Sequence, residues 1–295
     1  MKLATFTVEG RDADRVGVVD SEAGVLKDIT DALGVQGLLD VITTWSARRI
    51  ELTAVLAALP TIPLEEVILG APIPTLVRNV FCVGKNYSDH VREFGRSGYD
   101  TPSRSEELPA RPIVFSKVPS SVTGPYDDIE SHPGLTDELD YEGELGVIIG
   151  TGGRGISRDE AYDHVWGYTI INDVTARDLQ RDHKQWLLGK SLDTHCPMGP
   201  YAVSSDEIGD VSTLEIETLV NGERRQFAPV KDLIFDIPEL IATISAGITL
   251  VPGDVIATGT PAGVGIGFDP PRFLRSGDVV EVRITGLGAQ RNTIA

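Results

Sequence analysis

Short apolar runs broken by glycine and proline dominate the pattern along the chain. At the start, the side chains at positions 3, 5 and 7 alternate with apolar ones at 4, 6 and 8, and 16–20 follow as a second run, which predicts two strands. Later runs of the same kind predict six more strands, at 80–83, 113–115, 145–149, 167–171, 255–257 and 279–284.

Helical signals are fewer. The stretch 47–59 has the spacing of a helix that places Ile50, Val55 and Leu56 on one side and stops at Pro60.

Two capping signals predict short helices in the second part of the chain. Ser157 with Glu160 has the spacing of a capping box and predicts a helix at 161–164. Asp236 with Glu239 has the same spacing and predicts a helix directly after it.

These elements group into two parts. Residues 1–70 predict a small N-terminal α/β domain, and 61–78, which is rich in proline and glycine, predicts a connector. Residues 71–295 predict a β-rich domain large enough to hold a catalytic site. The expected fold class is therefore α+β with a predominance of strands.

Composition and charge narrow the function classes. The chain has 295 residues, 44 acidic against 26 basic, and a formal net charge of −18, which disfavours binding to nucleic acid or to anionic membranes. No apolar run is long enough to span a bilayer, and the first residues do not have the pattern of a secretory signal. With only two cysteines, we expect a cytoplasmic enzyme without structural disulfides.

Three carboxylates form the strongest candidate site. Glu142 and Glu144 are two residues apart in a predicted strand, so both project to one face, and Asp173 ends another apolar strand. Hard divalent cations prefer such oxygen ligands. The alternatives are a solvated strand face for the two glutamates and a helix N-cap for the aspartate.

A histidine and a glutamate form a second candidate. His90 and Glu93 are three residues apart, so on a helical turn they are neighbours and can form a hydrogen bond. A histidine held by a carboxylate can act as a general base for water, whereas the alternatives are metal ligation and a surface ion pair. Residues 95–111, which follow, predict a mobile loop or lid.

Two more segments have features of ligand-holding elements. Lys190 lies between an apolar pair and a turn, where it could hold a carboxylate or an enolate. The glycine-rich stretch 258–265 exposes backbone N–H groups that suit an anion. No G-x-S-x-G elbow and no Cys-His pairing is present, and the other four histidines lack the spacing of metal ligands.

Taken together and in this order, these motifs resemble the fumarylacetoacetate hydrolase family, in particular its bacterial acylpyruvate hydrolase and 2-hydroxyhepta-2,4-diene-1,7-dioate isomerase branch. The resemblance extends over about 80–294. The matching segments are Val83-Gly-Lys-Asn-Tyr87 with His90 and Glu93, followed by 115–120, 141–150, 172–180, Gly189-Lys190-Ser191, 193–200, Val220-Asn-Gly222 and 258–265.

The resemblance implies a mixed β-sandwich roll, a homodimer, and Mg²⁺ or Mn²⁺ held by Glu142, Glu144 and Asp173. It further implies that Lys190 supports a developing enolate and that the His90–Glu93 pair activates water. Contacts to a small oxo-acid substrate are implied for Tyr87, Gln180 and Thr260.

The expected function is hydrolysis of a C–C bond in a 2,4-dioxo acid, such as an acylpyruvate or a diketo sugar acid, because a metal-bound 2-oxo acid is an electron sink. Since the same sink serves other reactions, an isomerase or an oxaloacetate-type decarboxylase of an oxo-diacid is the alternative. A catalytically silent ligand-binding protein is a third possibility, which the retained His90–Glu93 pair disfavours.

Overall fold

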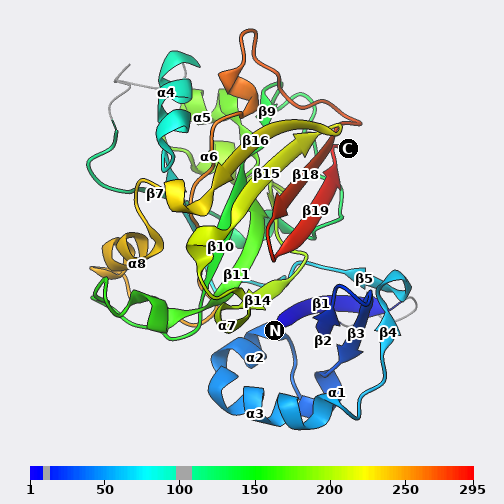
Figure 1. Ribbon diagram of the computed structural model, residues 1–295. Helices are drawn as coiled ribbons and strands as arrows, with labels where there is room; N and C mark the ends of the chain where they lie inside the picture. Colours follow the sequence, from blue (N-terminus) through cyan, green and yellow to red (C-terminus); the bar gives the residue numbers. More distant parts are fainter. Residues whose placement is uncertain (9–13, 98–107) are drawn as a thin grey trace.

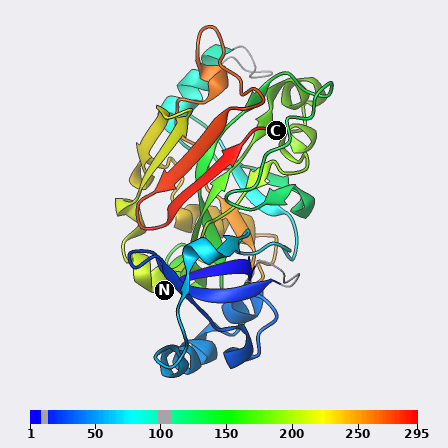
Figure 2. The same cartoon turned by 90° about the vertical axis from the view of Figure 1, so that its right-hand side faces the viewer.

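The computed structural model describes residues 1–8, 14–97 and 108–295, and its elements form a small N-terminal unit joined to a larger, β-rich part (Figure 1). Figure 2 shows the same two parts after a quarter turn. The fold class is α+β with a predominance of strands, as the sequence predicts.

The N-terminal unit is a small antiparallel sheet with helices packed on it. β1 (Lys2–Val8) lies at its centre and pairs with β2 (Arg15–Asp20) and β5 (Val67–Leu69), so the two strands predicted at the start are confirmed. The connector predicted at 61–78 is wrong in its first part, because two strands run through it. The remaining elements are β3 (Val25–Asp28), β4 (Ile62–Pro63), α1 (Thr30–Leu33), α2 (Leu38–Thr43), α3 (Trp45–Leu56) and the 3₁₀ turn η1 (Leu64–Glu66).

The helix α3 corresponds to the one predicted at 47–59, but its buried side differs from the prediction. Leu52 is fully buried, whereas Ile50 is 75% exposed and the prediction for that residue is wrong. The reason is tertiary: α3 packs against the short helices α1 and α2, and their position selects Leu52.

The larger part continues the sheet of the N-terminal unit. β1 pairs with β14, and from there the strand order runs β14-β11-β10-β17-β6-β7. All six strands predicted in this part are confirmed, as β6 (Val80–Gly84), β7 (Ile113–Lys117), β10 (Gly143–Ile149), β11 (Val165–Asn172), β17 (Val255–Ala257) and, in the second sheet, β18 (Val279–Ile284). The sequence did not predict β14 (Ala202–Ser204).

A second antiparallel sheet covers one face of the first, in the order β16-β15-β18-β19 (Figure 1). The contacts of β15 with β10 and of β18 with β11 bring the two layers together. The central strands β10 and β11 are buried along their whole length, which explains their nearly continuous apolar sequences. The other bounds are β15 (Glu215–Val220), β16 (Glu223–Pro229), β19 (Gly288–Thr293), and the two-stranded pairs β9 (Leu139–Asp140) with β12 (Thr175–Ala176) and β8 (Val122–Thr123) with β13 (Cys196–Pro197).

Three of the short helices, α4, α5 and α6, gather at one end of this sandwich (Figure 1). The helices are α4 (Ser88–Ser97), α5 (Arg177–His183), α6 (Leu187–Lys190), α7 (Ser205–Ile208) and α8 (Ile237–Ser245). The 3₁₀ turns are η2 (Pro119–Ser121), η3 (Ala161–His164), η4 (Val211–Thr213), η5 (Val230–Asp232) and η6 (Gly265–Gly267).

The two capping signals have different outcomes. Asp236 caps α8 by accepting from the backbone N–H of Glu239 at 2.9 Å, as predicted. The Ser157 hydroxyl donates to the Glu160 carboxylate at 2.7 Å, but the helix after it is only the 3₁₀ turn η3.

The lid predicted at 95–111 falls mostly outside the described residues. Its first residues belong to the last turn of α4, and only 108–111 of its remaining residues are among those the structure describes. Within the described ranges, no helix is long and apolar enough to cross a membrane.

Candidate active site

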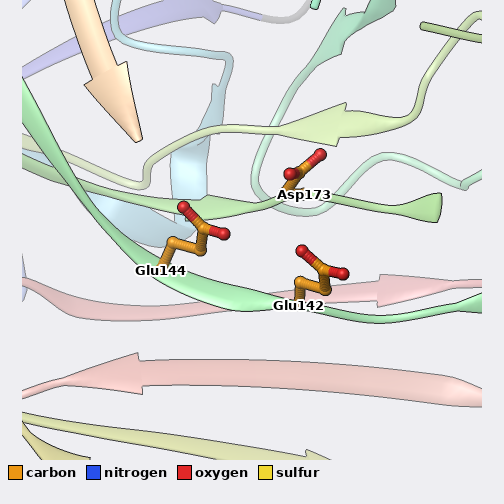
Figure 3. A group of neighbouring side chains, drawn as sticks. All are labelled: Glu142, Glu144 and Asp173. Carbon is orange, nitrogen blue, oxygen red and sulfur yellow. The ribbon is translucent and has the colours of Figure 1, made fainter. Parts of the chain in front are cut away.

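Three buried carboxylates converge at the start of β10 and the end of β11. Glu142 directly precedes β10, Glu144 lies within it, and Asp173 follows β11. The antiparallel pairing of these strands, extended by a hydrogen bond from the Asp173 N–H to the Glu142 carbonyl at 2.8 Å, brings the three together. One oxygen of each carboxylate lies within 4.8 Å of the others, and Figure 3 shows the side chains around a common space. We call Glu142, Glu144 and Asp173 the carboxylate triad.

Three buried cations surround the carboxylate triad. The Lys190 Nζ donates to Glu142 and to Asp173, in both cases at 2.8 Å. Lys117 donates to the other oxygen of Asp173 at 2.7 Å, and an Arg177 nitrogen lies 2.7 Å from Glu142. Neither Lys117 nor Arg177 is predicted as a site residue from the sequence, although both are charged residues in otherwise apolar or site-forming segments.

The two glutamates of the triad have different electrostatic environments. Burial by itself raises the pKa of Glu142, but Lys190 and Arg177 outweigh it and lower that pKa to about 2. Glu144 forms no ion pair with a described residue and accepts a hydrogen bond from the Gly259 N–H at 2.8 Å. Burial, and then the neighbouring Asp173 and Glu142, raise the pKa of Glu144 well above its usual value.

This arrangement fits a hard divalent cation. All three donors are carboxylate oxygens, the ligand type that Mg²⁺ and Mn²⁺ prefer. The buried Glu144 forms no ion pair with a described residue, and a cation between the three side chains would supply a counter-charge in direct contact with it.

The helix α4 positions His90 and Glu93 as neighbours. The His90 Nδ1 lies 3.4 Å from the Glu93 carboxylate, and the His90 side chain is only 6% exposed. Because Nδ1 faces Glu93, Nε2 is the nitrogen left for a proton transfer. Glu93 also accepts hydrogen bonds from the Gly263 N–H at 3.0 and 3.1 Å, which ties α4 to the loop 258–265.

The loop 258–265 is predicted to bind an anionic ligand through its backbone N–H groups, and the structure shows a different use of these groups. Its N–H groups serve carboxylates of the protein itself: Gly259 serves Glu144 and Gly263 serves Glu93. Gly265 donates in the same way to Asp140 at 2.6 Å. The loop thus holds the carboxylates of the site in place. The sequence could not show this, because the carboxylates that accept these hydrogen bonds are distant from the loop along the chain.

A pocket at this end of the sandwich brings most of the predicted residues together. His90, Gln180, Lys190 and Thr260 line it with Glu142 and Glu144, and its apolar walls are Phe94, Phe115 and Trp186. Gln180 accepts from Arg177 at 3.2 Å, and the Thr260 hydroxyl donates to the Gly143 carbonyl at 3.0 Å. Both side chains are thus held by the same elements that hold the triad.

Two other predicted site residues join the site without lining this pocket, Asp173 through the triad and Glu93 through His90, whereas Tyr87 has no such contact among the described residues. It does not belong to the described lining of this pocket and instead borders a neighbouring cavity with Phe227 and Pro261. Its contact with a substrate stays a prediction without support from this geometry.

A glycine allows Lys190 to reach the triad. Gly189 lies so close to α5 that a Cβ atom there would be 2.6 Å from the Gln180 backbone nitrogen. A side chain at this position would push α6, and with it Lys190, away from Glu142 and Asp173.

Asp140 is a further supporting residue that sequence reasoning missed. This fully buried side chain accepts from Arg177 at 2.9 Å and from the N–H groups of Gly265 and Ile266. It thereby fixes the guanidinium that contacts Glu142. The available signal was an acidic residue two positions before a predicted site glutamate.

Three of the four histidines outside the site contact backbone carbonyl groups. His132, His164 and His195 lie 2.8–3.1 Å from carbonyl oxygens. None of them joins a metal-type cluster within the described part of the chain.

Comparison with known proteins relates this chain to the fumarylacetoacetate hydrolase family, in agreement with the resemblance of its motifs. The family model described as "Fumarylacetoacetate (FAA) hydrolase C-terminal" matches residues 79–295. The oxaloacetate tautomerase YisK of Bacillus subtilis is 54% identical over 231 residues, which cover 78% of this chain and 74% of that protein.

Two solved structures share the fold over the whole chain. A fumarylacetoacetate hydrolase from Exiguobacterium antarcticum has a TM-score of 0.86 and 45% identity, covering 100% of this chain and 99% of that one. A maleylpyruvate hydrolase from Sphingobium sp. SYK-6, in complex with manganese(II) and pyruvate, has a TM-score of 0.81 and 31% identity with the same coverage.

Proposed function

This chain belongs to the fumarylacetoacetate hydrolase family, and we propose that within it the protein is a divalent-metal-dependent tautomerase of a short 2-oxo diacid of the oxaloacetate type. The reaction interconverts keto and enol forms: a proton leaves C3 and a proton is added to the C2 oxygen. The observation that carries the proposal is the buried carboxylate triad with Lys190 beside it, in a chain 54% identical to a protein named oxaloacetate tautomerase.

The triad is the proposed binding site for Mg²⁺ or Mn²⁺. A cation held there would polarise the C2 carbonyl of a bound 2-oxo acid and make the C3 hydrogens more acidic. The manganese(II) and pyruvate in the related maleylpyruvate hydrolase support both the metal class and the ligand class.

Lys190 and His90 have complementary roles in this proposal. Lys190 is held between Glu142 and Asp173, and these two carboxylates outweigh burial and raise its pKa, so it stays cationic. It would stabilise the negative charge that develops on the substrate oxygen. His90, oriented by Glu93, would accept the C3 proton at Nε2 and return it in the reverse direction.

Hydrolysis of an acylpyruvate, the function first expected from the sequence, is the second candidate. The His90–Glu93 pair favours it, because the same base could instead take a proton from an attacking water. The likeness to a maleylpyruvate hydrolase also supports it, but that protein is 31% identical, against 54% for the tautomerase. The tautomerase is therefore the better-supported proposal.

A direct assay separates the two candidates. Freshly dissolved enol-oxaloacetate should convert to the keto form faster with the protein and Mn²⁺ than without protein, measured by ultraviolet absorbance in a stopped-flow instrument. EDTA should abolish the acceleration, and added Mn²⁺ should restore it. A panel of 2,4-dioxo acids assayed in parallel should be cleaved more slowly. Acylpyruvate cleavage without any effect on enol-oxaloacetate would reject the tautomerase in favour of the hydrolase.

A further inference from the structure

Trp186 forms one wall of the pocket beside the carboxylate triad. It directly precedes α6, the helix that carries Lys190, and it lines the pocket together with Gly84 and Phe115. The pocket has little free space, because its cavity volume is about 20 Å³ and a single water molecule needs about 10–15 Å³. The size of a ligand that fits therefore depends on which walls can make room for it.

Two neighbours hold the Trp186 ring in place. The backbone of Gly84 lies so close that a Cβ atom there would be 2.6 Å from a carbon of the ring. Phe115 meets the ring in a T-shaped contact, with the two ring centres 5.1 Å apart. Gly84 and Phe115 belong to the paired strands β6 and β7 of the large sheet. The Trp186 ring thus rests on the sheet and can make room for a ligand only by losing these contacts.

This wall adjoins the end of the pocket where the oxo-acid group of a substrate would bind. The Lys190 Nζ, which donates to two carboxylates of the triad, lies 5.1 Å from the centre of the Phe115 ring. Phe115 therefore lies against both Lys190 and Trp186, and the two rings form a continuous apolar wall that starts at the triad. We call Phe115 and Trp186 the aromatic wall.

The proposed roles of the other groups leave the aromatic wall for the tail of the substrate. C2 would lie at the triad and Lys190, and C3 within reach of His90. The atoms beyond C3 then need a third part of the lining, and the aromatic wall is the apolar part that adjoins Lys190. Extra atoms forced against tightly packed side chains are unfavourable.

We infer that Trp186 sets the size limit of the substrate, so that the pocket favours short 2-oxo acids such as oxaloacetate over acylpyruvates with a bulky group beyond C4. The inference rests on the proposed function for the orientation of the substrate, with its oxo-acid end at the triad. It assigns the selection between these substrates to the aromatic wall, since the triad and Lys190 would bind the oxo-acid group that both have in common.

Unreactive oxamates of increasing length test this limit. Oxamate has a 2-oxo acid group with nitrogen in place of C3, so it has no C3 hydrogen to lose. N-Methyloxamate adds an atom at the position of C4, and N-benzyloxamate adds a phenyl ring beyond it. Calorimetry on the Mn²⁺-loaded protein should show about 10- to 100-fold weaker binding of N-benzyloxamate than of N-methyloxamate, the range expected for atoms forced against a packed wall.

Trp186→Ala should relax this selection. The ratio of the two dissociation constants should fall by about tenfold or more, because the phenyl ring then occupies the space of the indole. Trp186→Leu keeps an apolar side chain against Gly84 and Phe115, and it should shift the ratio in the same direction by a smaller factor. This second variant provides the test if Trp186→Ala does not fold. A displaced Lys190 would weaken all the oxamates alike, so a selective gain for the longest one identifies the wall.

Trp45→Ala is the matched control. Trp45 begins α3 in the N-terminal unit and, like Trp186, is partly buried. It also makes a T-shaped aromatic contact, to Trp166, with ring centres 5.3 Å apart. Because Trp45 does not belong to the described lining of the triad pocket, its removal should leave the ratio of the dissociation constants unaltered.

The outcomes are distinguishable from those of the tautomerase assay. An unchanged ratio in the Trp186 variants, with an intact metal site by Mn²⁺ titration, would overturn the inference, as would equal binding of the two substituted oxamates, or no binding of oxamate, by the wild type. A selective gain in Trp186→Ala without any acceleration of oxaloacetate tautomerisation by the wild type would support the inference and reject the proposed function. Acceleration together with an unchanged ratio would support the proposed function and reject the inference.

Discussion

At the scale of single residues, the site depends on how buried charges are balanced. Glu142 is stabilised as an anion by Lys190 and Arg177, whereas Glu144 has backbone hydrogen bonding but no described ion pair. A divalent cation would complete this balance, because it adds positive charge next to the carboxylate that lacks it. The proposed ligand roles of the triad therefore lead to predictions about single substitutions.

The first prediction concerns Glu142. Glu142→Ala should abolish metal-dependent activity and lower Mn²⁺ affinity strongly, since one of three carboxylate ligands is lost. Calorimetric Mn²⁺ titration measures the affinity, and circular dichroism should show a folded protein. Glu138→Ala, which removes a partly exposed carboxylate bound to Arg181, is the matched control and should bind Mn²⁺ normally. Undiminished Mn²⁺ binding by Glu142→Ala would contradict the assignment of the triad.

The second prediction concerns His90. His90→Ala should lower tautomerisation and any acylpyruvate hydrolysis by about 10²–10⁴-fold, the usual contribution of a general base. Mn²⁺ affinity should change little, because the triad is untouched. Decarboxylation of oxaloacetate needs no base at C3, so that activity, where present, should fall much less. Near wild-type turnover on both substrates would refute the role of His90.

At the scale of elements, the turn between β6 and α4 connects the sheet to the helix that carries His90 and Glu93. Asn86 binds this turn to the segments around Phe235 and Thr258 through three side-chain hydrogen bonds. Both segments lie far from Asn86 in the sequence, so these hydrogen bonds connect distant parts of the chain at one end of the sandwich. The stability of the turn should therefore depend on this single buried amide.

The third prediction follows from that arrangement. Asn86→Ala should lower the free energy of unfolding by about 2–4 kcal/mol, because buried partners lose their hydrogen bonds. Urea unfolding monitored by fluorescence measures this loss. Asn79→Ala, which removes one amide contact to Ser116, is the control and should cost less than about 1.5 kcal/mol. Equal effects of the two substitutions would contradict the proposed importance of the turn.

At the scale of the whole molecule, a buried histidine makes stability depend on pH. His195 is fully buried, and burial together with the nearby charge of Lys117 lowers its pKa to about 3. In the unfolded chain a histidine binds a proton with a pKa of about 6.5. Between these values the unfolded state holds more protons, so the free energy of unfolding falls as the pH falls.

The fourth prediction tests this dependence. Between pH 7.5 and pH 5, His195 should reduce the stability of the wild-type protein by about 2 kcal/mol. His195→Gln retains a donor for the Glu130 carbonyl but cannot titrate, so its stability should fall less over the same interval. Urea unfolding at both pH values provides the comparison, with the partly exposed His164→Gln as control. If the free energy of unfolding falls equally in wild type and His195→Gln, the protonation of His195 is not the cause of the pH dependence.

The fifth prediction is a homodimer. The edge strand β7 of the large sheet carries Val114, which is 40% exposed, and the adjacent helix α6 presents Leu187 and Leu188, which are 44% and 51% exposed. Exposed apolar residues beside an unpaired strand edge favour association. Sedimentation should give a species of twice the 31.7 kDa chain mass, whereas a monomer at micromolar concentration would reject the dimer.

Features that depend on local geometry follow directly from the order of the amino acids. Alternation along a strand puts Glu142 and Glu144 on one face, and the three-residue spacing of His90 and Glu93 makes them neighbours on a helix. The order of the motifs identified the family, and the short apolar runs predicted the central strands. These properties need only neighbours along the chain, which is why they could be read without a structure.

Features that depend on distant segments arise only when the chain folds. Folding brought Lys117, Arg177 and Asp140 to the triad, directed the N–H groups of the 258–265 loop at protein carboxylates, and placed Tyr87 outside the pocket. It also joined β1 to β14, so that one sheet runs from the N-terminal unit into the larger part. The partners in these contacts are separated by up to about two hundred residues, as Lys2 and Val203 are, and no local pattern records such pairings.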